Sequence, residues 1–176
     1  MVDFMETLFI PPAPKIVEGN LLDQPVEVIV NAWNRNIIPW WLLWPQGVSA
    51  AIKKKAGLQP FIELGKTGPL PLGHAVMTSA GRLPYKAIIH VAGINMAWFA
   101  TEESIRTSVR SAMALAQKHR YKSIALPTIG AGTGGIGENR SLLWTMETLA
   151  ELASPLDVIV VRYRKPSTNQ ESATRV

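Results

Sequence analysis

Short apolar runs recur along the chain between glycine, proline and polar residues, and most have the length of a β-strand. The run Val28–Val30 is apolar without alternation, which is typical of a strand covered on both faces. Together with its neighbours it predicts a strand over 26–32. Comparable runs predict further strands at 15–17, 74–80, 86–93, 123–129 and 157–163.

Apolar residues spaced three or four apart predict the helices. One such face belongs to a helix that starts after Thr101, a residue type favoured at helix N-caps, and has Glu102 and Glu103 in its first turn. A shorter helix covers 48–57, which ends in glycine, and a last helix has its apolar face within 142–150. Strands that alternate with helices predict an α/β fold, a sheet between helical layers.

The chain of 176 residues is long enough to form one domain with a full core. We expect an N-terminal arm over 1–14, the domain over 15–164 and a disordered polar tail over 165–176. There is no cysteine, which excludes disulfides and a thiolate nucleophile and favours a reducing compartment, so we expect a cytoplasmic protein. No stretch approaches the ~20 apolar residues that span a bilayer, and Asp3 and Glu6 argue against a signal peptide.

The net charge of +5 and the isoelectric point near 9.7 favour anionic partners. Phosphate esters, nucleic acid and acidic membrane surfaces all meet this criterion. Aromatic residues do not alternate with a basic stripe, which argues against nucleic acid as the main partner. We expect no metal site and no cofactor.

The glycine-rich stretch IGAGTGGIG, residues 129–137, lies directly between a predicted buried strand and a predicted helix. Glycine lets the backbone approach an anion closely, and a helix N-terminus adds positive potential. The stretch is not a P-loop, because no Gly-Lys-Ser/Thr follows, and it lacks the spacing of a dinucleotide fingerprint. Taken alone, a glycine-rich turn of this kind is more often structural than functional.

A second group of polar residues follows the strand over 26–32. Asn31 and Asn34 lie at the strand end, and the connection finishes in Gly47 and Val48 before a helix. Ligands bind at the carboxyl ends of strands in α/β sheets, so two such loops can hold a diphosphate from both sides. We expect Asn31 to cap a turn and Asn34 to contact sugar hydroxyls.

Four motifs in a fixed order resemble those of the macro domain, an ADP-ribose-binding module. The resemblance covers roughly residues 15–163 and implies a three-layer α/β/α fold with a mixed, mostly parallel central sheet. The matching stretches are Gly19-Asn20-Leu21, Val30-Asn31-Ala32-Trp33-Asn34, LPYKAIIH at 83–90 and PTIGAGTGG at 127–135.

The resemblance also implies roles for individual residues. Asn20, beside Leu21, takes the place of the residue that receives the adenine amino group, and Tyr163 that of the aromatic residue that stacks on adenine. Asn34 is expected to hold the distal ribose. The diphosphate is expected to lie between two segments, one made of Gly47, Val48 and Ser49 and the other of Gly130, Ala131, Gly132, Thr133 and Gly134.

Catalysis is the least defined part of the resemblance. The hydrolytic branch has an aspartate where this chain has Ser49, and a serine cannot serve as a carboxylate general base. Another branch pairs a lysine of the following helix with an acid, for which this chain offers Lys53 and Glu138, although residues 53–55 are more simply a solvated lysine face. The candidate catalytic residues are therefore Asn34, Ser49 and Lys53, and His90 is expected to be a hydrogen-bonded core residue.

We accordingly expect a binder of ADP-ribose or a derivative with little or no hydrolase activity. The first alternative is an ADP-ribosyl hydrolase or O-acetyl-ADP-ribose deacetylase that uses a non-standard catalytic residue. The second is a nucleic-acid binder that accepts poly(A)-like ligands.

Tryptophan is concentrated in the connection after the strand over 26–32, at Trp33, Trp40, Trp41 and Trp44. Two prolines restrict this segment, which suggests a fixed loop. It is expected to form a lid over the distal ribose or a contact between subunits of a homo-oligomer, in preference to a membrane contact.

Overall fold

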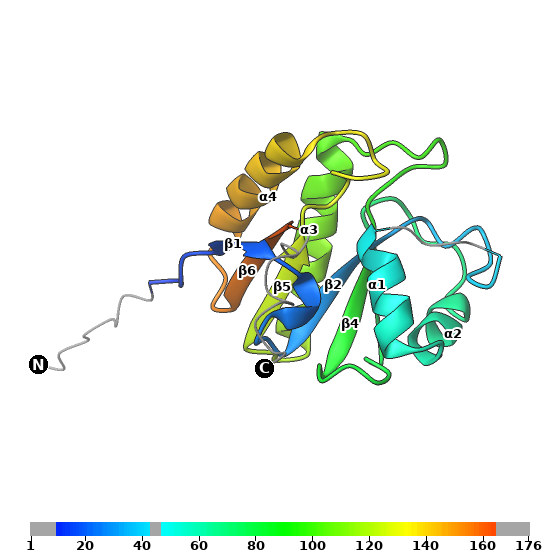
Figure 1. The fold of residues 1–176 in the computed structure, drawn as a ribbon. Coiled ribbons are helices and arrows are strands. Elements are labelled where there is room, and N and C mark those ends of the chain that lie inside the picture. The colour runs from blue at the N-terminus through cyan, green and yellow to red at the C-terminus, as the bar shows by residue number, and fades with distance from the viewer. Residues whose placement is uncertain (1–9, 43–46, 165–176) are drawn as a thin grey trace, which may run out of the picture.

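The computed structural model describes residues 10–42 and 47–164, and its centre is a six-stranded sheet (Figure 1). The strand order is β1-β6-β5-β2-β4-β3, and all neighbours are parallel except the edge strand β3, which runs antiparallel to β4. The strands are β1 Lys15–Gly19, β2 Val28–Trp33, β3 Ala75–Thr78, β4 Ala87–Ala92, β5 Ser123–Pro127 and β6 Asp157–Tyr163. The predicted mixed, mostly parallel sheet is confirmed.

Each face of the sheet has its own helical layer, because successive side chains of a strand point to opposite faces. Val28 and Val30 of β2 belong to the core under α3 and α4, whereas Ile29 belongs to the core under α1 and α2. Figure 1 shows these helix pairs on the two sides of the sheet, which confirms the three-layer α/β/α fold. The helices are α1 Gly47–Ala56, α2 Gln59–Gly65, α3 Glu102–Lys118 and α4 Glu138–Leu152, with a 3-10 turn, η1, at Leu21–Asp23.

The start of α3 agrees with the prediction made from Thr101. Its hydroxyl accepts the N–H of Ser104 at 3.1 Å, and the Ser104 hydroxyl accepts the N–H of Thr101 at 2.9 Å. This reciprocal capping box satisfies two backbone donors that a helix start would otherwise leave unpaired.

Two elements, η1 and α2, were not predicted from the sequence. Pro60 in the first turn of α2 was the available signal, since proline is well tolerated at that position. The strand β2 also begins at Val28 and not at Val26. Glu27 donates its N–H to the Ser123 hydroxyl at 2.9 Å, so it does not continue the strand ladder.

The first described residues of the predicted N-terminal arm lie against the domain. Pro11–Pro14 border a cavity of about 200 Å³ beside the last residues of α4. Residues 1–9 of the predicted arm and the tail over 165–176 lie outside the described residues. Within the described residues no helix is long and apolar enough to cross a membrane, and no three potential metal-ligating side chains lie together.

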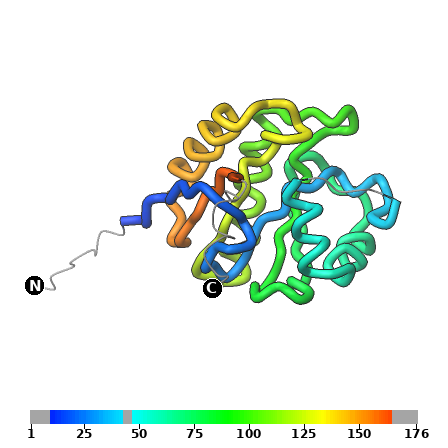
Figure 2. Tube along the Cα trace, viewed as in Figure 1, coloured from blue at the N-terminus to red at the C-terminus, as the bar shows by residue number. Residues whose placement is uncertain are grey.

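The carboxyl ends of the parallel strands lie at one edge of the sheet, and the segments that follow them gather there. The segment after β2 leads to α1 on one face, whereas the segment after the neighbouring β5 leads to α4 on the other face. Figure 2 shows the β5–α4 segment in yellow along the top of the molecule, next to the green segment before α3. Such a point of divergence is where open α/β sheets bind ligands.

Candidate ligand-binding site

The glycine loop, residues 128–137 between β5 and α4, presents backbone donors. The N–H groups of Gly132, Thr133 and Gly134 make no hydrogen bond to any other described residue. A Cβ atom built on Gly132 would have nothing within 4 Å, so this part of the loop is open. Adjacent unpaired N–H groups on an open backbone are suited to an anion.

Other glycines of this loop hold its shape. A Cβ atom on Gly130 would lie 2.5 Å from Cβ of Ala100, and one on Gly134 would lie 2.7 Å from the carbonyl oxygen of Gly130. Gly134 also accepts the N–H of Ala100 at 3.0 Å, which ties the loop to the segment before α3. The loop is therefore fixed from behind and open in front.

The N-terminus of α1 is the second feature of this edge that is suited to an anion. The helix begins at Gly47, which has φ +56, and has no acidic residue in its first turn. The N–H groups of the first turn of a helix have no acceptor inside the helix and carry positive potential. The glycine loop follows β5 and the segment that leads to α1 follows the neighbouring β2. The two segments lead to opposite faces of the sheet, which is the arrangement expected for two segments that hold a diphosphate between them.

Ser49, in the first turn of α1, is buried and tied to β2. Its hydroxyl donates to Oδ1 of Asn31 at 2.6 Å and lies 3.0 Å from the carbonyl oxygen of Ala32. Asn31 is fully buried and not a turn cap, so the role predicted for it was wrong. It fixes the helix start to the sheet because its carbonyl oxygen takes the only proton that Ser49 can donate.

The hydrogen bonds continue from Asn31 through the sheet. Nδ2 of Asn31 donates to Nδ1 of His90 at 3.0 Å, so the ring proton lies on Nε2 and is donated to Oγ1 of Thr78 at 2.9 Å. The Thr78 hydroxyl in turn donates to the carbonyl of Ser79 at 3.0 Å. Burial lowers the pKa of His90 from 6.5 to about 3, against a smaller opposing effect of the Glu63 charge. His90 is therefore a neutral core histidine, as predicted.

Asn34 lies at the start of the segment after β2 and is half-buried. Its Oδ1 accepts the N–H of Asn36 at 2.7 Å, so Asn34 is the residue that caps a turn. Its Nδ2 has no hydrogen-bond partner among the described residues. The turn cap predicted for Asn31 is thus formed by Asn34, while the amide donors of Asn34 stay available for a ligand.

At the other end of the edge, β1 and β6 end side by side. Gly19 is paired with Tyr163 and accepts the N–H of Arg164 at 3.1 Å. The Tyr163 side chain is 64% exposed, which leaves its ring free to stack on a flat ligand group. Asn20 caps η1, since its Oδ1 accepts the N–H of Leu22 at 3.1 Å, and Leu21 is buried. The Leu21 side chain therefore packs in the core and stabilises η1 at this end of the sheet edge.

The pairing of Lys53 with Glu138, which was considered from the sequence but not favoured, does not form. Nζ of Lys53 donates to the carbonyl of Trp40 at 3.1 Å and lies 5.4 Å from the centre of the Trp40 ring. Glu138 binds Arg162 at 2.8 Å and Arg164 at 3.0 Å, and these hydrogen bonds lower the pKa of its carboxyl group. Both candidate partners are thus committed elsewhere, and the lysine-dependent mechanism was a wrong hypothesis for this pair.

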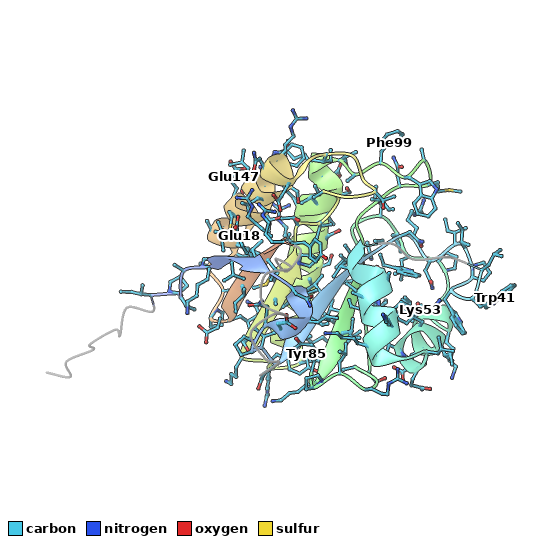
Figure 3. The ribbon with its side chains drawn as sticks, in the orientation of Figure 1. Glu18, Trp41, Lys53, Tyr85, Phe99 and Glu147 are labelled. Carbon is cyan, nitrogen blue, oxygen red and sulfur yellow. The ribbon has the colours of Figure 1, made fainter. Side chains whose placement is uncertain are left out.

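The tryptophans of the segment after β2 have separate positions. Trp33 is buried and packs on Phe61, with ring centres 5.5 Å apart. Trp40 packs against Gly65 of α2, where a Cβ atom would lie 2.7 Å from the ring. Trp41 is exposed at the periphery (Figure 3), and Trp44 lies outside the described residues. The lid prediction was therefore wrong for Trp33 and Trp40, which stabilise the α1–α2 layer.

The segment before α3 is a part of this edge that was not assigned to the site from the sequence. It joins the glycine loop through the Ala100–Gly134 hydrogen bond. Met96, Trp98 and Phe99 are exposed, and their concentration in a short connection before the helix was the available signal in the sequence.

The fold and this edge define the general class: an α/β/α protein with an anion-binding arrangement at the carboxyl ends of its parallel strands. The family model of the Macro domain matches residues 30–142. The chain belongs to the macro domain family, as its four motifs predicted.

Individual relatives agree with this assignment. The chain is 35% identical over 123 residues to an uncharacterized protein of Aquifex aeolicus, covering 69% of this chain and 72% of that protein. It is 32% identical over 166 residues to a Citrobacter rodentium protein named O-acetyl-ADP-ribose deacetylase, covering 87% and 89%. The Oceanobacillus iheyensis macrodomain with ADP superposes with a TM-score of 0.71 at 27% identity, covering 86% and 83%.

Proposed function

We propose that this chain binds ADP-ribose or a close derivative, with the diphosphate between the glycine loop and the N-terminus of α1. The observation that carries the proposal is the open face of the loop, where Gly132, Thr133 and Gly134 have unpaired N–H groups. The family supports it, and the related macrodomain of Oceanobacillus iheyensis was solved with ADP. A cytoplasmic location, consistent with the absence of cysteine, is part of this proposal.

The two ends of the ligand follow from the arrangement of the strands. Adenine stacks on the exposed ring of Tyr163 at the ends of β1 and β6. The remaining carbonyl lone pair of Asn20 accepts the adenine amino group. The distal ribose reaches the end of β2, where the amide donors of Asn34 bind a hydroxyl group.

We propose further that hydrolysis is slow or absent. Ser49 donates its proton to Asn31 and cannot act as a carboxylate base. Lys53 is bound to the Trp40 carbonyl, and Glu138 to two arginines. The described residues at this edge therefore offer no positioned acid or base of the usual kind.

The alternative function is that of a hydrolase or deacetylase. It is favoured by the Citrobacter rodentium relative, whose name is O-acetyl-ADP-ribose deacetylase. Single-turnover assays with O-acetyl-ADP-ribose and with ADP-ribosylated protein separate the two proposals. Release that survives in Lys53→Ala would establish a hydrolase that uses an acid or base not identified above.

The binding proposal is tested by calorimetric titration with ADP-ribose, ADP, AMP and oligo(A). We expect ADP-ribose to bind and oligo(A) to bind weakly or not at all, whereas preferential oligo(A) binding would support the nucleic-acid alternative suggested by the positive charge.

The matched variants for this titration are Gly132→Leu and Gly132→Ala. A Cβ atom at Gly132 has no other protein atom within 4 Å, so we expect both variants to keep the melting temperature of the parent. We expect Gly132→Leu to abolish ADP-ribose binding, because the side chain occupies the space of the diphosphate, and Gly132→Ala to weaken it less. Unchanged affinity in Gly132→Leu would contradict the placement of the diphosphate.

A further inference from the structure

A rigid turn exposes three large apolar side chains before α3. We call residues 95–99 the apolar turn. Oδ1 of Asn95 accepts the N–H groups of Ala97 at 2.9 Å and Phe99 at 3.0 Å, and the Asn95 N–H donates to the Phe99 carbonyl at 2.9 Å. The exposed side chains are Met96 at 68%, Trp98 at 40% and Phe99 at 61%.

The backbone of the apolar turn is strained as well as fixed. Trp98 has φ +65, a region that residues with a side chain rarely adopt. A strained, tightly hydrogen-bonded backbone that holds apolar groups in solvent is explained if these groups gain a contact when a ligand binds.

The turn lies against the glycine loop. Ala100, the next residue, donates its N–H to the carbonyl of Gly134, and a Cβ atom on Gly135 would lie 4.0 Å from Cδ1 of Phe99. Figure 3 shows Phe99 at the upper edge of the molecule, on the segment that leads into α3. The Phe99 ring thus borders a stretch, residues 134 and 135, that has no side chains of its own.

The direction of the ligand places its terminal ribose beside this ring. In the proposed binding mode adenosine lies at the ends of β1 and β6 and the diphosphate at the end of β5. The strand order then directs the rest of the ligand toward β2 and β4. The apolar turn follows β4, and Asn34 follows β2. The terminal ribose, therefore, arrives between Asn34 and the apolar turn.

We propose that Phe99 is a specificity-determining residue, whose ring covers the terminal ribose and excludes water from it. This inference rests on the proposed binding of ADP-ribose. It predicts that Phe99 distinguishes ADP-ribose from ADP, which has the same adenosine and diphosphate but no terminal ribose.

The experiment compares the affinities of both ligands for the parent protein, Phe99→Ala, Phe99→Tyr and the control Met96→Ala. Met96 belongs to the same turn but does not border Gly135, and both side chains are exposed, so melting temperatures should be unchanged. We expect Phe99→Ala to weaken ADP-ribose about tenfold and ADP less than about twofold, with Phe99→Tyr and Met96→Ala close to the parent.

Two results would overturn the proposal: an unchanged affinity of Phe99→Ala for ADP-ribose, or an equal loss for ADP-ribose and ADP. The second would mean that Phe99 acts on the glycine loop and the diphosphate alone. A parent protein that binds neither ligand would refute the proposed function itself, and Phe99 would have no role in ligand selection.

Discussion

Ser49 was a candidate catalytic residue, but its side chain has a structural role. Its hydroxyl lies 2.6 Å from Oδ1 of Asn31 and 3.0 Å from the carbonyl of Ala32, two acceptors. In this arrangement Oδ1 of Asn31 faces the Ser49 hydroxyl, because Nδ2 of Asn31 is bound to His90. The site therefore requires a donor at position 49.

We predict that Ser49→Asp destabilises the protein more than Ser49→Ala does. Alanine leaves the buried carbonyl oxygen of Asn31 without its donor, which costs about 1–3 kcal/mol. A carboxylate adds repulsion from both oxygens in a buried place. Urea unfolding of the two variants measures the difference.

The same variants bear on catalysis. If Ser49→Asp were as stable as the parent and hydrolysed O-acetyl-ADP-ribose, position 49 would accept a catalytic acid without rearrangement. That result would contradict a structural role for the Ser49 hydroxyl.

At the level of the element, the glycine loop divides into glycines that shape it and a glycine that leaves room for a ligand. Gly134 is packed, with a Cβ position 2.9 Å from Cβ of Ala100, whereas Gly132 has nothing within 4 Å. A binding loop needs both kinds of glycine, because the open backbone at Gly132 can hold a ligand only if the packed backbone at Gly134 keeps the loop in place.

We predict that Gly134→Ala lowers both the melting temperature and the affinity for ADP-ribose, because the added methyl group displaces Gly130 or the segment before α3. Gly132→Ala is the matched control and should keep the melting temperature. Differential scanning calorimetry with and without ligand provides both readings. Equal melting temperatures in the two variants would show that Gly134 is not a packing residue.

The element scale also explains why Trp40 packs inside the α1–α2 layer and does not form a lid. Trp40 packs on Gly65 of α2, and its carbonyl oxygen holds Nζ of Lys53 from α1. Aromatic surface in this connection is therefore used to join two short helices, neither of which buries much surface alone.

At the scale of the whole molecule, the buried His90 links stability to pH. His90 contacts Asn31, Thr78 and the edge of Phe61, and the charge with a resolved influence on it is that of Glu63. Its pKa is lowered to about 3 in the folded protein from 6.5. The unfolded chain therefore binds the proton first as the pH falls, and stability is lost progressively below the unfolded value.

We predict that the free energy of unfolding begins to fall near pH 6.5 and that the slope steepens to about 1.4 kcal/mol per pH unit by about pH 5. Paired carboxylates such as Glu138 have lowered pKa values, so they add their own loss only at lower pH. Urea unfolding across this window measures the slope.

The controls for this slope use the histidines of the chain. His90→Gln should remove most of the pH dependence, even if it is less stable overall. The double variant His74→Gln/His119→Gln changes two exposed histidines and should retain the slope. A slope that is the same in His90→Gln and the parent would mean that another group titrates in this window.

Much of the fold could be predicted from the sequence because its signals are local. The apolar run Val28–Val30 and the helical spacing from Ile105 to Ala116 each describe burial of a single element. The order of the motifs defined the family and placed the glycine loop between a strand and a helix. The short α2 was missed, since its seven residues are too few for a clear periodicity.

The tertiary structure alone decided what each polar residue contacts. Positions 31, 49, 78 and 90 come from four elements, yet they form one chain of hydrogen bonds that turns Asn31 into a scaffold residue. Lys53 donates to the Trp40 carbonyl, and Glu138 accepts hydrogen bonds from two arginines. Phe99 lies beside Gly135. The sequence by itself determined the longer strands and helices and their apolar faces, because the burial of such an element follows local periodicity. It did not determine these contacts, because a side-chain hydrogen bond depends on distances of a few ångströms between segments that only the packed sheet and helices bring together.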